Sequence, residues 1–283
     1  MTNRLTLLLD SIKFEHSIFA LPFAYLGMVL AARGFPAWDK VLWITIAMVG
    51  ARTLAMAANR LIDSPYDALN PRTAGRAIPR GLLSRVEMGA MAVAGLGAML
   101  FAAAMLNPLC LQLSPIAVAV LVGYSWTKRF TWMSHAVLGL ADGMAPVGGW
   151  MAVTGSVDPP AILLGLAVLF WIGGFDLIYA CQDVEFDRKV RLYSFPARFG
   201  IAASLRMSIA WHVATVLLLA AAGAMLRLGA IYWVGLAVST GLLAYEHYLV
   251  RPDDLSRMDV AFFNLNGYVA VVLFVFTVGG LYV

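Results

Sequence analysis

The hydrophobic pattern of the chain consists of long apolar runs separated by short polar segments. Nine runs lie at about residues 15–33, 39–58, 86–106, 109–123, 134–153, 160–180, 205–224, 228–249 and 261–283. Most of them approach the roughly 20 residues with which a helix crosses the hydrocarbon core of a bilayer. The pattern therefore predicts an all-α, polytopic membrane protein with nine transmembrane helices and polar cap loops.

The composition supports this interpretation. Of 283 residues, 61% are hydrophobic and 13% are charged, and the mean hydropathy is +0.81, which is far too apolar for an ordinary soluble domain. No Ser-, Pro- or Gly-rich linker interrupts the runs, so we expect a single domain over residues 1–283. The first residues lack a small-residue cleavage pattern, and we expect the first run to be retained. Cys110 and Cys181 have no metal-binding spacing and are expected to pack as small apolar groups.

The basic residues predict the orientation. Sixteen of the 20 Lys and Arg residues lie in the N-terminus or in the segments 59–85, 124–133, 181–206 and 249–260, and three lie in the alternate loops. The positive-inside rule places the basic segments in the cytoplasm, so we expect a multi-pass protein of the cell inner (cytoplasmic) membrane. The same charge favours contact with anionic membrane lipids. Nucleic acid is not an expected partner, because no basic stripe with interleaved aromatics lies outside the loops.

Two clusters of carboxylates close apolar runs on the predicted cytoplasmic side. Asp183 and Asp187 follow the sixth run, four residues apart, and Asp63 and Asp67 follow the second run with the same spacing. On a helix this spacing puts both carboxylates on one face, where they repel each other. A divalent cation reverses that interaction, and clustered carboxylates are how proteins usually hold magnesium beside a phosphate. The two clusters predict an active site that faces the cytoplasm and binds one diphosphate through metal.

The residues of these clusters match sequence motifs of a known protein family. Asn59, Asp63 and Asp67 match the motif N-D-x-x-D-x-x-x-D, with Arg60 in place of its second residue. A second motif, D-x-x-Y-x-x-x-D-x-x-x-D, is matched in full by the set Asp176, Tyr179, Asp183 and Asp187. A third, Y-x-x-x-K, is matched by Tyr124 and Lys128. In these motifs and their order the chain resembles the UbiA superfamily of intramembrane prenyltransferases.

The sequence departs from the family pattern in a second place. After the second motif the family often has Lys-Ser, whereas this chain has Tyr193-Ser194. One basic contact to the diphosphate is therefore missing from its usual position. Arg191 and Arg198 are the candidate replacements.

The resemblance implies that two Mg²⁺ ions bridge the aspartates and a polyprenyl diphosphate, whose tail lies in a lipid-open groove. It implies transfer to a hydroxylated aromatic acid, 4-hydroxybenzoate or a dihydroxynaphthoate, in ubiquinone or menaquinone biosynthesis. The implied metal ligands are Asn59, Asp63, Asp67, Asp183 and Asp187, and the catalytic set adds Tyr124 and Lys128 to the aspartates. The substrate contacts are expected among Asn59, Arg72, Arg76, Tyr179, Asp176, Lys189, Arg198, Arg52 and His16.

Charges inside the apolar runs are functional candidates, because they cost roughly 2.5–3.5 kcal/mol near a helix centre on insertion scales. Arg52 lies two helical turns before Asn59 and has two interpretations, an acceptor contact or an internal ion pair with Asp142. Asp142 itself lies in a segment rich in Gly and Pro that favours close helix packing. Glu246 and His247 are expected to snorkel or to pair locally.

Aromatic side chains are candidates for shielding an allylic cation through their ring faces. They are Tyr124, Trp126, Trp150 and Tyr179. Tyr and Trp also concentrate at membrane interfaces without any such role.

Two other classes of protein remain as alternatives. A secondary transporter also places carboxylates and broken helices in the membrane, but it is expected to hold them near the midplane. An enzyme acting on another lipid diphosphate or a CDP-lipid is the second alternative. The chain lacks the Asp-Gly-x-x-Ala-Arg pattern of the CDP-alcohol transferases.

Overall fold

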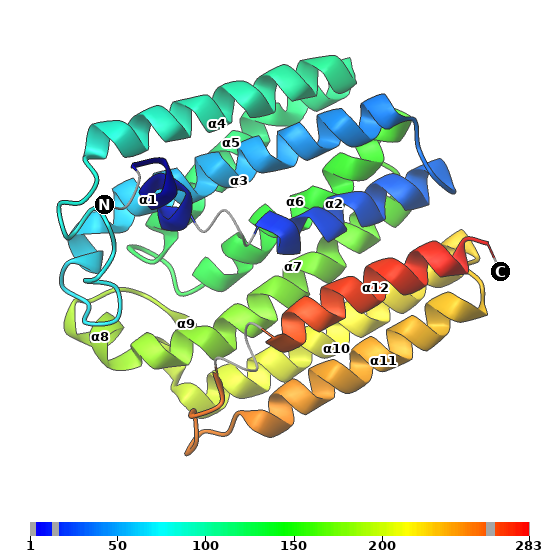
Figure 1. Cartoon of the computed structure of the whole chain (residues 1–283). Helices are drawn as coiled ribbons and strands as arrows, with labels where there is room; N and C mark the ends of the chain where they lie inside the picture. Colours follow the sequence, from blue (N-terminus) through cyan, green and yellow to red (C-terminus); the bar gives the residue numbers. More distant parts are fainter. Residues whose placement is uncertain (1–3, 13–16, 259–263, 283) are drawn as a thin grey trace. The chain divides into compact units, whose positions relative to one another are not determined.

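The computed structural model describes residues 4–12, 17–258 and 264–282 (Figure 1). Within these ranges the regular structure is helical, and the only β-type pairing is an isolated bridge between Arg251 and Asp254. The helices are α1 (Arg4–Ser11), α2 (Ser17–Ala32), α3 (Trp38–Asp67), α4 (Arg85–Leu106), α5 (Pro108–Thr127), α6 (Ser134–Thr154), α7 (Pro159–Tyr179), the 3₁₀ helix η2 (Ala180–Asp183), α8 (Val184–Lys189), α9 (Phe195–Phe199), α10 (Ile201–Leu226), α11 (Ala230–Leu249) and α12 (Asn266–Gly280).

The predicted all-helical membrane fold is confirmed, because each of the nine apolar runs overlaps one of the helices α2 to α7 and α10 to α12. Among the described residues, six segments are long and apolar enough to cross a membrane. They are α3, α4, α5, α6, the segment Pro159–Val190 and α10. The count of nine transmembrane helices stays a prediction, since α2, α11 and α12 are not in this set.

The chain divides into two compact units. Unit 1 comprises the described residues of Met1–Leu21 and Trp38–Trp126, and unit 2 those of Pro22–Ala37 and Thr127–Val283. The first carboxylate cluster belongs to unit 1 and the second to unit 2. The expectation of one domain over the whole chain stays a prediction.

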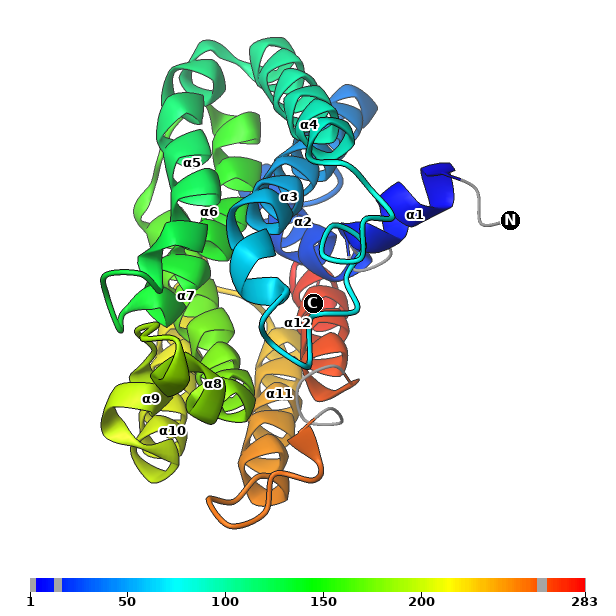
Figure 2. The same ribbon diagram turned by 90° about the vertical axis from the view of Figure 1, so that its left-hand side faces the viewer.

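Unit 1 is built on the packing of α3 against α4, which lie side by side in both views (Figures 1 and 2). The helices approach closely because glycine faces glycine: a Cβ atom on Gly95 would lie 2.8 Å from the Gly50 carbonyl oxygen. Helix α1 is attached by an ion pair between Arg4 and Glu87 of 2.6 Å. Glu87 also closes the capping box with Ser84 that begins α4.

Unit 2 contains the larger hydrophobic core, in which α7 packs against both α6 and α10. Trp171, 1% exposed, lies at its centre with Phe23 packed edge-on at 5.0 Å. The predicted close packing of the Gly-rich segment is confirmed. A Cβ atom on Gly139 would lie 2.2 Å from the Leu169 carbonyl oxygen, and one on Gly149 would lie 2.0 Å from that of Ala24. Small residues thus bring α6 against α7 on one side and against α2 on the other.

Candidate functional site

The first carboxylate cluster lies at the C-terminal end of α3, which continues nine residues past the apolar run that predicted it and ends at Asp67. Asn59, Asp63 and Asp67 are therefore on one helix with the expected spacing. The Asn59 amide Nδ2 donates to Asp63 Oδ2 at 2.6 Å and to Ser125 Oγ at 3.1 Å. In this orientation Asn59 presents its NH₂ group, not an oxygen, to Asp63, so it positions that carboxylate.

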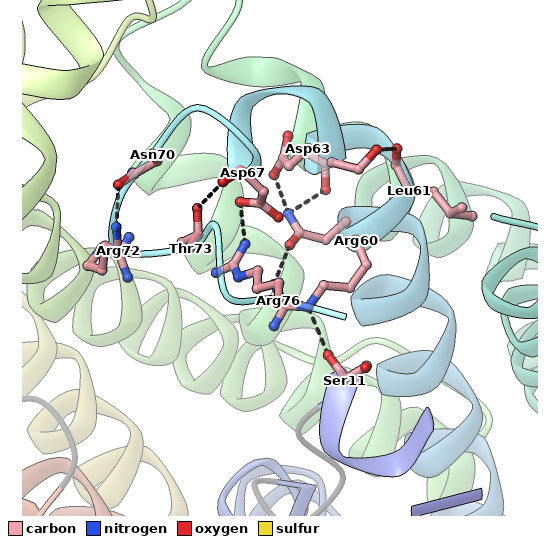
Figure 3. A network of polar contacts seen from close by, with 12 residues as sticks. Ser11, Arg60, Leu61, Asp63, Asp67, Asn70, Arg72, Thr73 and Arg76 are labelled. Carbon is pink, nitrogen blue, oxygen red and sulfur yellow. Dashed lines mark hydrogen bonds and ion pairs between the residues drawn. The ribbon is translucent and has the colours of Figure 1, made fainter. Parts of the chain in front are cut away.

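Asp67 is buried, with only 6% of its surface exposed. Its Oδ1 accepts a hydrogen bond from Arg76 Nη1 at 2.6 Å, so the predicted phosphate contact Arg76 is held against the carboxylate (Figure 3). The Thr73 hydroxyl donates to the Asp67 main-chain carbonyl at 3.2 Å and folds the following loop back over the helix end. The Asp67 Oδ2 atom has no hydrogen-bond partner among the described residues.

Arg60, which stands where the family often has an aspartate, is 8% exposed. Its Nε donates to the carbonyl oxygen of Ser11, the last residue of α1, at 2.8 Å (Figure 3). Its Nη1 lies 3.5 Å from Asn59 Oδ1. Arg60 therefore satisfies a free carbonyl at a helix end and holds α1 beside the first cluster.

The second cluster does not lie on one continuous α-helix, which corrects our expectation. Helix α7 ends at Tyr179, the 3₁₀ turn η2 carries residues 180–183, and α8 begins at Val184. Asp183 and Asp187 are nonetheless both buried, at 7% and 2% exposure. Lys128 Nζ lies 3.8 Å from Asp187 Oδ2, an oxygen that has no hydrogen-bond partner among the described residues. The 3₁₀ turn changes the winding between Tyr179 and Asp183, whereas Asp183 and Asp187 keep their four-residue spacing at the start of α8.

Asp176, the first residue of the second motif, is paired with a histidine that the sequence analysis did not single out. Its Oδ2 lies 2.6 Å from Nδ1 of His135, near the start of α6. Tyr179 is half-buried against the cluster of apolar residues that joins η2 to α10 and α11. The Ser194 hydroxyl hydrogen-bonds Asp187 and caps α9 by accepting from the Ala197 amide.

In the third motif, Tyr124 is in the last turn of α5 and Lys128 follows the end of that helix. Arg72, Lys189 and Arg198 are exposed, and the Arg198 guanidinium lies 5.4 Å from the Phe199 ring centre. Arg52 is half-buried, and its Nε has no hydrogen-bond partner among the described residues. His16 lies outside the described residues.

Two interpretations of individual residues were wrong. Trp150 donates to Asp158 Oδ2 at 2.8 Å, at the start of α7. The 21 residues of α7 separate that position from η2, a length of about 30 Å, so Trp150 does not shield a cation beside Asp183. For Glu246 the snorkelling alternative is wrong and the side chain is paired instead: it is 0% exposed and accepts from Asn266 of α12 at 3.3 Å.

The donor set of both clusters fits magnesium. Carboxylate oxygens are the ligands that this hard cation prefers, and one buried oxygen each of Asp67 and Asp187 lacks a hydrogen-bond donor within the described part of the chain. No group of three or more His, Cys, Asp or Glu residues in that part already lies close enough to hold a metal ion. Arg76 lies 2.6 Å from Asp67 and Lys128 lies 3.8 Å from Asp187, so each of these carboxylates also has a basic side chain beside it.

Comparison with known proteins decides the family. The model of the UbiA prenyltransferase family matches residues 20–268. The chain belongs to this family. The prediction of a prenyltransferase is thereby confirmed, and nothing in the comparisons supports the transporter alternative. The chain is 32% identical over 249 residues to the 4-hydroxybenzoate octaprenyltransferase of Nitrosospira multiformis, an alignment that covers 88% of this chain and 85% of the relative.

Solved structures of UbiA homologues have the same fold. The apo structure of a UbiA homologue from Aeropyrum pernix K1 superposes with a TM-score of 0.85 at 34% identity, covering 93% of this chain and 96% of that one. A UbiA homologue from Archaeoglobus fulgidus bound to DMAPP and Mg²⁺ superposes with a TM-score of 0.75 at 19% identity, covering 98% of this chain and 99% of that one. At that identity the second likeness shows the fold alone.

Proposed function

We propose that this UbiA family member transfers a polyprenyl group from polyprenyl diphosphate to a hydroxylated aromatic acid, 4-hydroxybenzoate or a dihydroxynaphthoate, in quinone biosynthesis. The observation that carries the proposal is the similarity, over most of both chains, to a 4-hydroxybenzoate octaprenyltransferase. We further propose nine membrane-spanning helices in the cell inner membrane, with the basic loops and the active site on the cytoplasmic side.

Each carboxylate cluster contributes to binding the magnesium diphosphate. Asp63 and Asp67 of the first motif and Asp183 and Asp187 of the second are the proposed ligands of two Mg²⁺ ions. Bound magnesium neutralises the diphosphate and stabilises the charge that develops as it leaves. Asn59 completes the set if its amide turns to present its oxygen; in the orientation described above it holds Asp63 in place.

Basic side chains bind the phosphate oxygens. Lys128 approaches Asp187 at 3.8 Å with its side chain 36% exposed, so its ammonium group can hydrogen-bond a phosphate without leaving the cluster. Arg76 performs the corresponding role beside Asp67. The other proposed diphosphate contacts are three exposed side chains: Arg72 after α3, Lys189 at the end of α8 and Arg198 in α9.

In the transfer, the bond between C1 of the prenyl chain and the diphosphate oxygen breaks, and the diphosphate leaves with the bonding electrons. C1 then bonds to a ring carbon of the acceptor, which releases its proton. The rings of Tyr124 and Tyr179 stabilise the allylic cation, and Asp176 orients the substrate. Arg52 binds the acceptor carboxylate, and this role explains why a charged residue is present in the apolar part of α3. His16 is a second proposed contact of the acceptor.

The experiment that tests the proposal is a transfer assay with purified protein, geranyl diphosphate and Mg²⁺, with either 4-hydroxybenzoate or a dihydroxynaphthoate as acceptor. Mass spectrometry should detect a product heavier than the acceptor by one geranyl group for at least one acceptor. Excess EDTA should abolish its formation, and added Mg²⁺ should restore it. Absence of product with both acceptors would contradict the proposed substrates, and full turnover in EDTA would contradict the metal requirement.

A further inference from the structure

The histidine that contacts the second motif is almost completely enclosed. His135 is 1% exposed at the start of α6. One ring nitrogen, Nδ1, lies 2.6 Å from Asp176 Oδ2. The other, Nε2, lies 3.3 Å from the backbone nitrogen of Phe195, the first residue of α9.

These two contacts determine which nitrogen carries the ring proton. A backbone N–H can only donate, so Nε2 of His135 accepts the hydrogen bond from Phe195. The neutral ring then has its proton on Nδ1, which donates to the Asp176 carboxylate. The side chain is consequently held at both ends, and its orientation cannot reverse without loss of both hydrogen bonds.

The segment on the Nε2 side of His135 is the one that departs from the family pattern. Tyr193 donates its backbone N–H to the carbonyl oxygen of Lys128 at 2.6 Å. Trp132, three residues before His135, packs edge-on against Phe195 at 5.6 Å and against Phe199 at 5.2 Å. The turn that carries Lys128 and the segment that follows the second motif are thus joined around His135.

We propose that His135 is a positioning residue of the second motif, which fixes the orientation of the Asp176 carboxylate toward the substrate. This inference rests on the proposed function, because it assigns Asp176 a substrate contact. The Asp176 side chain is 20% exposed while His135 is closed off, so the carboxylate can reach a ligand and the imidazole cannot. The hydrogen bond from Nδ1 of His135 to one Asp176 carboxylate oxygen fixes the direction in which the second carboxylate oxygen points.

The two hydrogen bonds of His135 can be removed separately. The amide of asparagine lies where Nδ1 lies, so His135→Asn keeps a donor for Asp176 and loses the acceptor for Phe195. Glutamine reaches the position of Nε2, so His135→Gln keeps the acceptor for Phe195 and loses the donor for Asp176. His135→Ala loses both. A residue that only stabilises the fold would change the unfolding temperature of these variants and leave their analogue requirement unchanged.

Two measurements are made on each variant, both as full-length protein. The first is kcat and KM for geranyl diphosphate. The second is the concentration of geranyl S-thiolodiphosphate, a non-ionising analogue, that gives half of the maximal thermal stabilisation in Mg²⁺. Loss of a hydrogen-bond partner that orients a metal-binding side chain typically costs about 10- to 100-fold, and we apply the same range to Asp176. We expect His135→Gln and His135→Ala to lose that much in kcat/KM and to need about tenfold more analogue, whereas His135→Asn stays within about threefold of the wild type in both.

The matched control is His212→Asn, which removes another buried imidazole of unit 2, 3% exposed, whose ring contacts His247 and the Trp171 carbonyl. It should lower the unfolding temperature and leave the analogue requirement unchanged. Equal behaviour of the Asn and Gln variants, or a Gln variant closer to the wild type than Asn, would overturn the positioning role even if His135→Ala does not fold. A wild type that yields no prenylated product while the analogue measurements keep the predicted order would overturn the proposed substrates and not this inference.

Discussion

A single methyl group added to Gly149 should separate α2 from α6. Gly149 faces the backbone of α2, and a Cβ atom there would lie 2.0 Å from the Ala24 carbonyl oxygen and 3.2 Å from the Met28 nitrogen. Because both contacts are main-chain atoms, no change of rotamer can relieve them. Gly148, the preceding residue of the same helix, has no atom within 4 Å of its added Cβ and provides the matched control.

The size of the effect follows from two opposing contributions. Overpacking of a filled interior costs about 1–3 kcal/mol, and a backbone clash belongs at the upper end. Alanine regains about 1 kcal/mol of helix propensity relative to glycine, which leaves Gly149→Ala about 2 kcal/mol less stable. For a chain of this size that corresponds to an unfolding temperature lowered by roughly 4–8 °C. Gly148→Ala gains only the propensity and should melt at or slightly above the wild-type temperature.

The two buried thiols of the chain supply the assay. Cys110 and Cys181 are 7% and 4% exposed, so a thiol-reactive fluorophore labels them only when the protein unfolds. In a Cys110→Ala background the label reports Cys181 alone, which lies in the same unit as the α2–α6 contact. If Gly149→Ala and Gly148→Ala melted within about 1 °C of each other, the close packing of these two helices would be refuted.

Three further predictions concern the carboxylate clusters and the core. Asp63→Ala and Asp183→Ala should each lower kcat/KM by more than about 100-fold, a loss near 2.7 kcal/mol. The control is Asp39→Ala, at the exposed first turn of α3, which should leave kcat/KM unchanged. If the Asp63 or the Asp183 variant kept a tenth of the activity, the substituted aspartate would not be a principal metal ligand. Lys128→Gln should lower kcat more than it raises KM for prenyl diphosphate. The contact of Lys128 with phosphate contributes about 1.5–3 kcal/mol and strengthens as the leaving group gains charge. Kinetics within about twofold of wild type would show that Lys128 is an ordinary loop lysine. Asn266→Leu should lower the unfolding temperature by several degrees. The substitution removes the hydrogen-bond partner of Trp171 Nε1, at 2.7 Å, and that of Glu246, and each buried unpaired group costs about 1–3 kcal/mol. An unchanged melting curve would show that these hydrogen bonds contribute no net stability.

The apolar runs alone predicted the nine longest helices of this protein, α2 to α7 and α10 to α12. A run of about 20 residues without charge has few alternatives to a membrane helix, because every backbone group must be satisfied within the segment. The four-residue spacing of Asp63 and Asp67 predicted one face of a helix, and α3 extends to Asp67 and carries both. The small residues of the segment that contains Gly139 and Gly149 also predicted close packing, since only a side chain without bulk lets two backbones approach.

Only the tertiary structure decided what each polar group contacts. The partner of Asp176 is His135, which lies 41 residues earlier, and the partner of Glu246 is Asn266, which lies 20 residues later on another helix. Spacing along one helix defines a face, but it carries no information about which side chain of a neighbouring helix meets that face. The break between Tyr179 and Val184 has no local signal, because residues 180–183 include no glycine or proline, and it is seen only in the folded chain.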